Sequence, residues 1–230
     1  MNRPRDIKIQ NESVRILFFD TSCDFILVGL YSLQNKEIKE EYFYAGNHPR
    51  ESSYRLLSDI QLGLTSVSWD KPDVVSCAIG PGSFTGIRIS VATARNLSQL
   101  WKIPNLGFDT IEMYSNFYSD FYKSPVIAVL DGKQKKVFAG SFRNETYKGT
   151  FDISPSEFEN QFKEELDTEN RIIIADTNLV KHDFTIESLL PNPISILKRN
   201  ISKLEGLTLA DNSYLTLLPK YMRNTYAHKE

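Results

Sequence analysis

The sequence predicts an α/β protein of two lobes, each built from the unit βββαβα. Short apolar runs alternate with stretches of helical periodicity along most of the chain. The same opening, an apolar strand that ends in aspartate, occurs at Val14–Asp20 and again at Val126–Asp131. Because the two stretches share a pattern but not their residues, they indicate a duplication of fold.

Length and composition set the outer bounds. The chain has 230 residues, enough for two compact lobes with a real core. We assign residues 1–13 to a frayed N-terminal segment, 14–122 to the first lobe, and 123–230 to the second lobe with a basic tail. No stretch approaches the ~20 apolar residues of a membrane span, and the N-terminus lacks the apolar core of a signal peptide. We therefore expect a cytoplasmic protein.

The net charge and the cysteine content argue against direct nucleic-acid binding and against a cysteine-based metal site. The net charge is −2, whereas a protein whose main task is to bind nucleic acid usually has a clustered basic surface. Cys23 and Cys77 lie in strand-like apolar contexts without a neighbouring Cys or His at metal spacing, so we interpret them as buried free thiols. Direct RNA binding and a metal site are both disfavoured.

The first lobe opens with a predicted antiparallel meander. Its three strands are Val14–Phe19 ending at Asp20, Phe25–Tyr31, and Glu37–Tyr44. A helix is expected over Glu51–Leu64, where apolar residues recur with helical spacing. These residues are Leu56, Leu57, Ile60 and Leu64.

A strand-to-helix elbow organises the rest of the lobe. The apolar run Asp73–Ile79 is followed by Gly80-Pro81-Gly82, which allows a tight turn, and Ser83 is the expected helix N-cap. The free N–H groups at such a helix start can hold a phosphate or carboxylate, but the same geometry also serves as a plain connection. A phosphate loop of the Walker type requires Lys and then Ser or Thr after its last glycine, and here Ile87-Arg88 follows Gly86.

The helix behind the elbow, which we expect to reach Trp101, has a ridge of small side chains. Gly86, Ser90, Ala94 and Ser98 recur every four residues, so another backbone can approach this face closely. After a short connection at Ile103–Gly107 and a further strand, Asp109 is expected to cap another helix.

The remaining elements are read in the same way. They are a helix over Thr110–Phe121, strands at Val126–Asp131, Val137–Phe142 and Tyr147–Thr150, a helix over Ser154–Glu165 with Ser154 as its cap, a strand at Arg171–Asp176, and a helix over Ile194–Lys203. The tail from Tyr214 to Glu230 carries a basic group formed by Lys220, Arg223 and Lys229.

Three motifs together resemble the bacterial TsaB (YeaZ) family. They are the run GPGSFTGIRI at the elbow, Asp20-Thr21-Ser22 near the N-terminus, and Pro219-Lys220-Tyr221-Met222-Arg223-Asn224 near the C-terminus. The resemblance implies the two-lobed fold of actin, sugar kinases and Hsp70 ATPase domains. It also implies a non-catalytic subunit of the tRNA threonylcarbamoyl transferase complex, which forms N6-threonylcarbamoyladenosine at position 37 of tRNAs that read codons beginning with A.

The same resemblance implies partners and cofactors. The partners would be a TsaD-type transferase subunit and a TsaE-type ATPase, and tRNA would be reached mainly through the complex. The complex would use ATP, while this chain would have no cofactor, metal or catalytic residue of its own. Relatives carry a histidine where this chain has Ser52 and Ser53, and Asp-Ala-Arg where it has Asp131-Gly132-Lys133. The role of the turn that continues to Lys136 is therefore left open.

Two sets of candidate site residues follow. For the partner interface, the two amphipathic helices offer Ser52, Leu56, Ile60, Leu64, Gly86, Ser90 and Ala94. The same surface would drive self-association without the partner. Candidate anion or nucleotide contacts are Asp20, Thr21, Gly82, Ser83, Thr85 and Arg88.

Two enzymatic alternatives have the same fold. An independent peptidase of the M22 type or another hydrolase requires a nucleophile, a base and an orienting group, and His48, His182 and His228 each lack a recognisable partner. An independent ATP-dependent kinase requires glycine-rich phosphate turns after both first strands, and neither turn here has that form. A shared fold does not decide between these functions.

Overall fold

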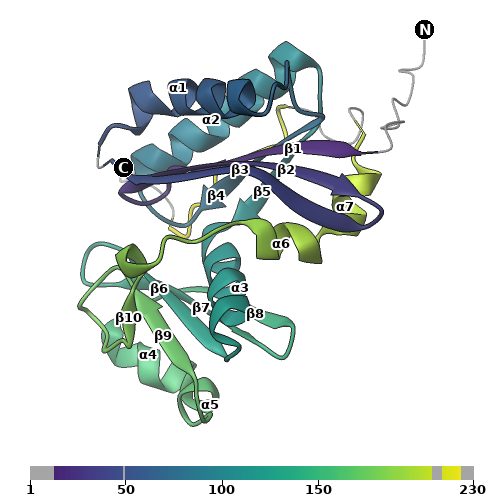
Figure 1. Cartoon of the computed structure of the whole chain (residues 1–230). Coiled ribbons are helices and arrows are strands. Elements are labelled where there is room, and N and C mark those ends of the chain that lie inside the picture. The colour runs from purple at the N-terminus through teal and green to yellow at the C-terminus, as the bar shows by residue number, and fades with distance from the viewer. Residues whose placement is uncertain (1–12, 49, 209–213, 224–230) are drawn as a thin grey trace, which may run out of the picture.

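The computed structural model describes residues 13–48, 50–208 and 214–223, so the expected frayed segment lies almost entirely outside the described residues. The strands form two mixed sheets, ordered β3-β2-β1-β4-β5 and β10-β9-β6-β7-β8. In each sheet the first strand of the unit, β1 or β6, pairs antiparallel with the next strand and parallel with a later one. The prediction of a two-lobed α/β fold with a repeated unit is confirmed (Figure 1).

The first lobe follows the predicted order of elements. It comprises β1 (Val14–Asp20), β2 (Phe25–Gln34), β3 (Glu37–Asn47), α1 (Ser52–Ser66), β4 (Val74–Gly80), α2 (Phe84–Trp101) and β5 (Asn105–Asp109). Both β2 and β3 run longer than expected because they pair along their whole length: β2 continues to the hairpin turn, and β3 continues at its other end to pair with the start of β2. β5 begins inside the expected connection.

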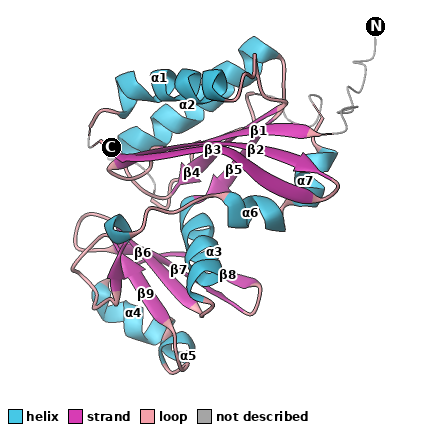
Figure 2. Ribbon diagram, in the orientation of Figure 1, coloured by secondary structure: helices cyan, strands magenta, loops and turns pink. Residues whose placement is uncertain are grey.

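Both faces of the first sheet are buried. Successive side chains of a strand point to opposite faces, so Ile16 and Phe18 join one core cluster while Leu17 and Phe19 join another. Helices α1 and α2 cover the second of these faces, away from the other lobe (Figure 2). The apolar faces of both helices therefore pack against this side of the sheet.

The second lobe repeats the arrangement with shorter elements. It comprises β6 (Val126–Asp131), β7 (Val137–Arg143), β8 (Thr146–Ile153), α4 (Pro155–Gln161), α5 (Lys163–Leu166), β9 (Ile172–Ala175), β10 (Phe184–Thr185) and a 3-10 turn at Ile186–Ser188. The single helix expected to begin at Ser154 is broken at Phe162, whose ring is buried in the core of this lobe. β10 was missed because two residues are too short to show a period.

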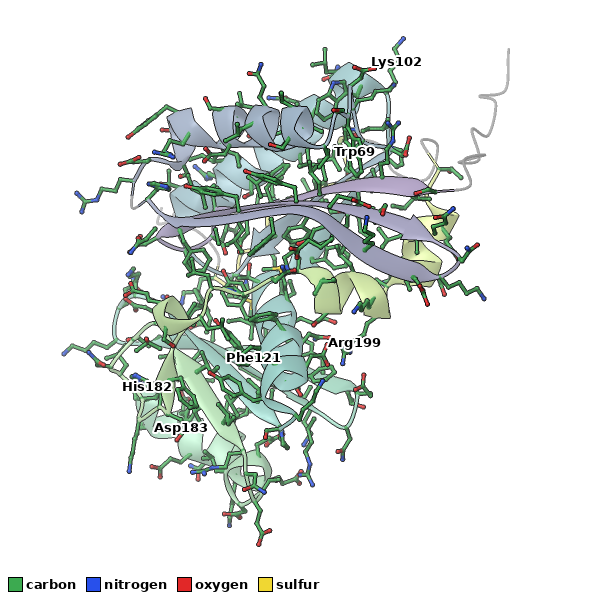
Figure 3. The ribbon with its side chains drawn as sticks, in the orientation of Figure 1. Trp69, Lys102, Phe121, His182, Asp183 and Arg199 are labelled. Atoms are coloured by element: carbon green, nitrogen blue, oxygen red, sulfur yellow. The ribbon has the colours of Figure 1, made fainter. Side chains whose placement is uncertain are left out.

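Three helices join the lobes. α3 (Thr110–Tyr122) packs on β6 and β7, and its buried residues share one core cluster with β1 and β6. α6 (Ile194–Arg199) contacts α3 and β3, so the chain returns to the first lobe after β10. The helix expected to run to Lys203 is interrupted at Asn200, where the side-chain amide donates to the Ile196 carbonyl, and α7 (Ile201–Gly206) follows. Figure 3 shows Arg199 on the side of α6 that faces the second lobe.

Candidate functional site

A cavity of about 620 Å³ lies between the lobes. Its first-lobe wall is the turn after β1, with Ser22 and Asp24, and the elbow from Pro81 to Thr85. Its second-lobe wall includes Asp131, Lys133 and Asp176, and the C-terminal stretch from Lys220 to Arg223 lines one side. The cavity is thus assembled from segments far apart in the sequence.

The elbow is shaped by two glycines. Gly80 has a φ of +107°, which glycine adopts without strain, and the side chain of Ser83 accepts a hydrogen bond from the Gly86 N–H as the N-cap of α2. The Ser83 N–H donates to the Ser22 carbonyl over 2.6 Å. A Cβ at Gly82 would lie 2.4 Å from that same oxygen, so only glycine lets the elbow rest on the first turn.

The small ridge of α2 is occupied by this chain itself. The Thr21 hydroxyl donates to the Gly86 carbonyl over 2.7 Å, and the Thr21 N–H donates to the Ser90 hydroxyl over 3.1 Å. A Cβ at Gly86 would lie 1.7 Å from the Thr21 carbonyl oxygen. Gly86, Ser90 and Ala94 are buried against the chain's own turn and sheet, so the proposed role of this ridge in a partner interface requires correction.

Asp20 does not reach the cavity. It is fully buried at the end of β1, where one oxygen accepts from the Ser22 N–H and the other from the Tyr114 hydroxyl, each over 2.7 Å. Burial raises the pKa of the Asp20 carboxyl, and the hydrogen bonds from Ser22 and Tyr114 offset part of that rise. Asp20 and Thr21 therefore serve internal packing in this structure. Sequence reasoning missed Tyr114, because its position on α3 resembles that of any core aromatic.

The other predicted anion contacts lie at the cavity or its rim. Gly82, Ser83 and Thr85 line it at the N-terminus of α2, where the helix dipole favours an anion. Arg88 lies on the next turn, with its guanidinium 3.7 Å from the centre of the Phe84 ring and its Nε donating to the Tyr221 hydroxyl over 2.9 Å. An anion or nucleotide at this helix start stays a prediction.

The second-lobe wall is acidic, with a lysine held against it. Lys133 Nζ lies 2.7 Å from Asp131 Oδ2, and the Lys133 N–H also donates to Asp131. Burial would raise the pKa of Asp131, but these hydrogen bonds outweigh it and lower that pKa. Asp176 accepts from the Asp131 N–H over 2.6 Å and is exposed to solvent at the cavity wall. Partial desolvation by the surrounding protein, together with the Asp131 charge, raises the pKa of Asp176 to about 6. Sequence reasoning did not single out Asp176.

The residues predicted for the interface on α1 divide between two faces. Leu56, Ile60 and Leu64 are only 1%, 3% and 8% exposed because they pack on the sheet, and Ser52 is half-buried. The outward side chains are Tyr54, Leu57 and Leu62, which are 65%, 59% and 59% exposed. The outer surface of α2 carries Thr85, Ala92, Asn96 and Leu100. An interface on these helices would therefore use the opposite face from the one predicted.

The described residues contain neither a metal-binding cluster nor a membrane-spanning helix. No group of three or more His, Cys, Asp or Glu residues in the described ranges is arranged to hold a metal ion. Within the same ranges, every helix is too short or too polar to cross a membrane.

Comparison with curated proteins finds relatives with one shared name. A TsaB protein, described as a tRNA threonylcarbamoyladenosine biosynthesis protein, from Buchnera aphidicola subsp. Schizaphis graminum is 31% identical over 135 residues, 57% of this chain and 62% of the relative. The protein of that name from Escherichia coli K12 is 28% identical over 57% of this chain and 56% of its own length. The chain thus spans less than two thirds of these relatives.

Solved structures and family models agree with this picture. YeaZ from Pseudomonas aeruginosa has a TM-score of 0.67 at 17% identity, covering 91% of this chain and all of that one, which shows a shared fold. The family model of TsaD, tRNA N6-adenosine threonylcarbamoyltransferase, matches residues 34–205, well over half of the chain. The chain therefore belongs to the family that the TsaD model describes and is a homologue of the TsaB proteins.

Proposed function

We propose that this chain is a partner subunit of the tRNA threonylcarbamoyl transferase complex and that it is needed for N6-threonylcarbamoyladenosine at position 37 of tRNAs that read codons beginning with A. The names of the curated relatives support the pathway. The family model supports a partner of the same fold, a TsaD-type transferase subunit. In this proposal the transferase reaction belongs to that partner.

The observation that carries the proposal is the apolar outer face of α1 and α2. Tyr54, Leu57 and Leu62 on α1 and Leu100 on α2 are more than half exposed, although the core-facing stripe of each helix is already buried. Exposed apolar side chains gathered on one face mark an interaction site. On α2, Ala92 lies on the outer surface, where a small side chain lets a second helix approach closely.

The other parts of the assembly follow from the same proposal. A TsaE-type ATPase joins the two subunits, the complex consumes ATP, and tRNA is bound mainly through the complex in the cytoplasm. Without the transferase subunit, the outer face of α1 and α2 drives homodimer formation, because an apolar patch is then left in water.

Two experiments test the proposal. In cells that lack this chain, mass spectrometry of tRNA nucleosides should show loss of threonylcarbamoyladenosine, and the wild-type chain should restore it. The purified chain should bind the transferase subunit in a calorimetric titration, and Leu57→Glu and Leu62→Glu should weaken that binding. Leu179→Glu is the matched control, because Leu179 is an exposed leucine of the second lobe.

Three results would contradict the proposal. The first is a normal level of threonylcarbamoyladenosine in cells that lack this chain. The second is an affinity for the transferase subunit that is the same for the wild type and all variants. The third is turnover of ATP or of a peptide by the isolated chain. The last result would instead favour an independent kinase or peptidase.

A further inference from the structure

The elbow and the C-terminal motif, which are far apart in the sequence, touch each other. The Lys220 N–H donates to the Ile79 carbonyl over 2.7 Å, at the end of β4. A Cβ at Gly80 would lie 2.9 Å from the Lys220 carbonyl oxygen, so the first glycine of the elbow also leaves room for this segment. Leu217 is buried in the core of the first lobe and anchors the segment on that side.

The same segment carries two cations that pair with largely enclosed carboxylates. The Lys220 ammonium pairs with Asp109, which ends β5 and caps α3. The Arg223 guanidinium forms a two-pronged pair with Asp152 on β8 and lies 5.5 Å from the centre of the Phe138 ring on β7. Lys220 thus holds the segment to the first lobe, and Arg223 holds it to the second.

These pairs differ from ordinary surface ion pairs. The side chains of Asp109 and Asp152 are only 10% and 11% exposed, whereas exposed pairs contribute little because water screens both charges. Asp152 would lose its charged partner in a largely enclosed place if Arg223 were replaced, which is costly. Asp109 would keep hydrogen bonds from the Glu112 N–H and the Thr150 hydroxyl without Lys220, so the Arg223 pair is the stronger of the two attachments. The pair also fixes the orientation of the Arg223 side chain, because Nε and Nη2 of the planar guanidinium each donate to a different carboxylate oxygen of Asp152.

A third contact ties the segment to the start of α2. Tyr221 packs on Phe84 with ring centres 5.3 Å apart, and its hydroxyl accepts from Arg88. Four successive residues, from Lys220 to Arg223, line the interlobe cavity. The segment therefore lies along the cavity with fixed contacts at both of its walls.

We propose that Leu217–Arg223 is a strap that holds the two lobes at one fixed opening and closes one side of the interlobe cavity. Two-lobed proteins move by rotating their lobes about a few connecting residues, and a bridge across the mouth of the cleft restricts that rotation. Releasing the ion pairs at Lys220 and Arg223 lets the cavity open. The strap concerns the isolated chain and does not rest on the proposed function.

The test measures the distance between the lobes in the full chain. Spin labels are placed at Gln61→Cys on α1 and Glu159→Cys on α4, two exposed positions, in a Cys23→Ala background that leaves only the buried Cys77. Pulsed electron resonance then gives the distribution of distances. The wild-type strap should give one narrow distribution, and Lys220→Met with Arg223→Met should add a longer component.

Controls separate the strap from a general effect of lost charge. Lys163→Met with Lys181→Met removes two exposed cations that do not line the cavity, and it should leave the distribution narrow. Exchanging the charges, with Arg223→Asp and Asp152→Arg, should restore the narrow distribution if the pair acts as a bridge. If circular dichroism shows that the double methionine variant does not fold, Asp152→Asn alone is measured and should also broaden the distribution. An unchanged distribution in a folded strap variant would overturn the proposal.

Discussion

The Tyr114 hydroxyl donates a hydrogen bond to the fully buried Asp20 carboxylate over 2.7 Å, which closes the end of β1 from the side of α3. In this fold the first strand of each lobe ends in aspartate, and the two carboxylates have different surroundings. Asp131, the counterpart in the second lobe, lines the interlobe cavity beside Lys133. The corresponding aspartates of the two lobes therefore have different roles: Asp20 is sealed in the core, and Asp131 is open to the cavity.

We expect Asp20→Asn to change how stability depends on pH. Burial raises the folded-state pKa of Asp20 above its unfolded value, so its contribution to stability is complete below about pH 4 and is lost as the pH rises through the folded pKa. Tyr114, Cys23 and Cys77 face Asp20, and burial raises the pKa of all three, so they stay neutral in this range. Urea denaturation should show the variant gaining stability relative to wild type as the pH rises above about 4. Exposed Asp167→Asn is the control, and parallel curves for wild type and Asp20→Asn would contradict the expectation.

Gly86→Ala should destabilise the fold, because its Cβ would lie 1.7 Å from the Thr21 carbonyl oxygen. Overpacking of this kind costs about 1–3 kcal/mol or more. Gly206→Ala is the matched helical control, because a Cβ there meets nothing within 4 Å. That control should be neutral or stabilise by up to about 1 kcal/mol. Equal urea midpoints for both variants would show that α2 moves away from the turn without cost.

Neighbouring leucines on α1 should respond very differently to truncation. Leu56→Ala removes a side chain buried in the first-lobe core and should cost about 2–5 kcal/mol of unfolding free energy. Leu57→Ala, at a position exposed in the single chain, should change it by less than about 0.5 kcal/mol when the protein is dilute enough for sedimentation to show a monomer. Thermal and urea unfolding of the pair under these conditions measure the difference. Similar losses at both positions in the monomer would contradict the prediction.

Asp176 should titrate near pH 6 in the folded chain, as measured by carbon-13 NMR of its carboxyl group. Desolvation is the main reason that its pKa is raised; the charges of Asp131 and Asp24 raise it further, and the charge of Lys133 lowers it. Asp131→Asn should therefore shift the titration to lower pH, and Lys133→Met should shift it to higher pH. The raised pKa also means that the stability contributed by neutral Asp176 is lost as the pH rises through about 6. A midpoint near 4, or shifts of opposite sign, would contradict this arrangement.

Arg199→Met should weaken the attachment of α6 to α3 in a pH-dependent way. Both terminal nitrogens of Arg199 donate to Asp120, and the hydrogen bonds lower the pKa of that carboxyl. Because the pKa of Asp120 is lowered, the pair stabilises the fold above the unfolded pKa and its contribution is lost as the pH falls. The variant should lose more stability relative to wild type at pH 7 than at pH 3. Exposed Lys163→Met controls for the loss of a charge, and a loss that does not depend on pH would point to packing on Phe142 instead.

The sequence by itself determined the order and kind of nearly all elements, because their signals are local. A few consecutive residues are enough to show the alternation of a strand, the period of a helix or the capping residue at a helix start. Asp109 accepts from the Glu112 N–H, and Ser154 forms a capping box with Glu157, at the expected helix starts. The helix break at Phe162 and the two-residue β10 fell outside this reach, since a buried ring and a single strand pairing decided them. The break at Asn200 involves a contact four residues apart, but helical periodicity does not report it.

Only the tertiary structure decided what each face meets. Periodicity identified the apolar stripe of α1 and the small ridge of α2, but the same stripe can pack on the chain's own sheet or on another subunit. The ridge did require close approach of a backbone, and that backbone is Thr21 of this chain. The contacts of Asp20 with Tyr114 and of Ile79 with Lys220 join residues about 90 and 140 positions apart, and no local pattern reports such a pairing. Their energies depend on which groups folding brings together and removes from water, and only the three-dimensional arrangement supplies that.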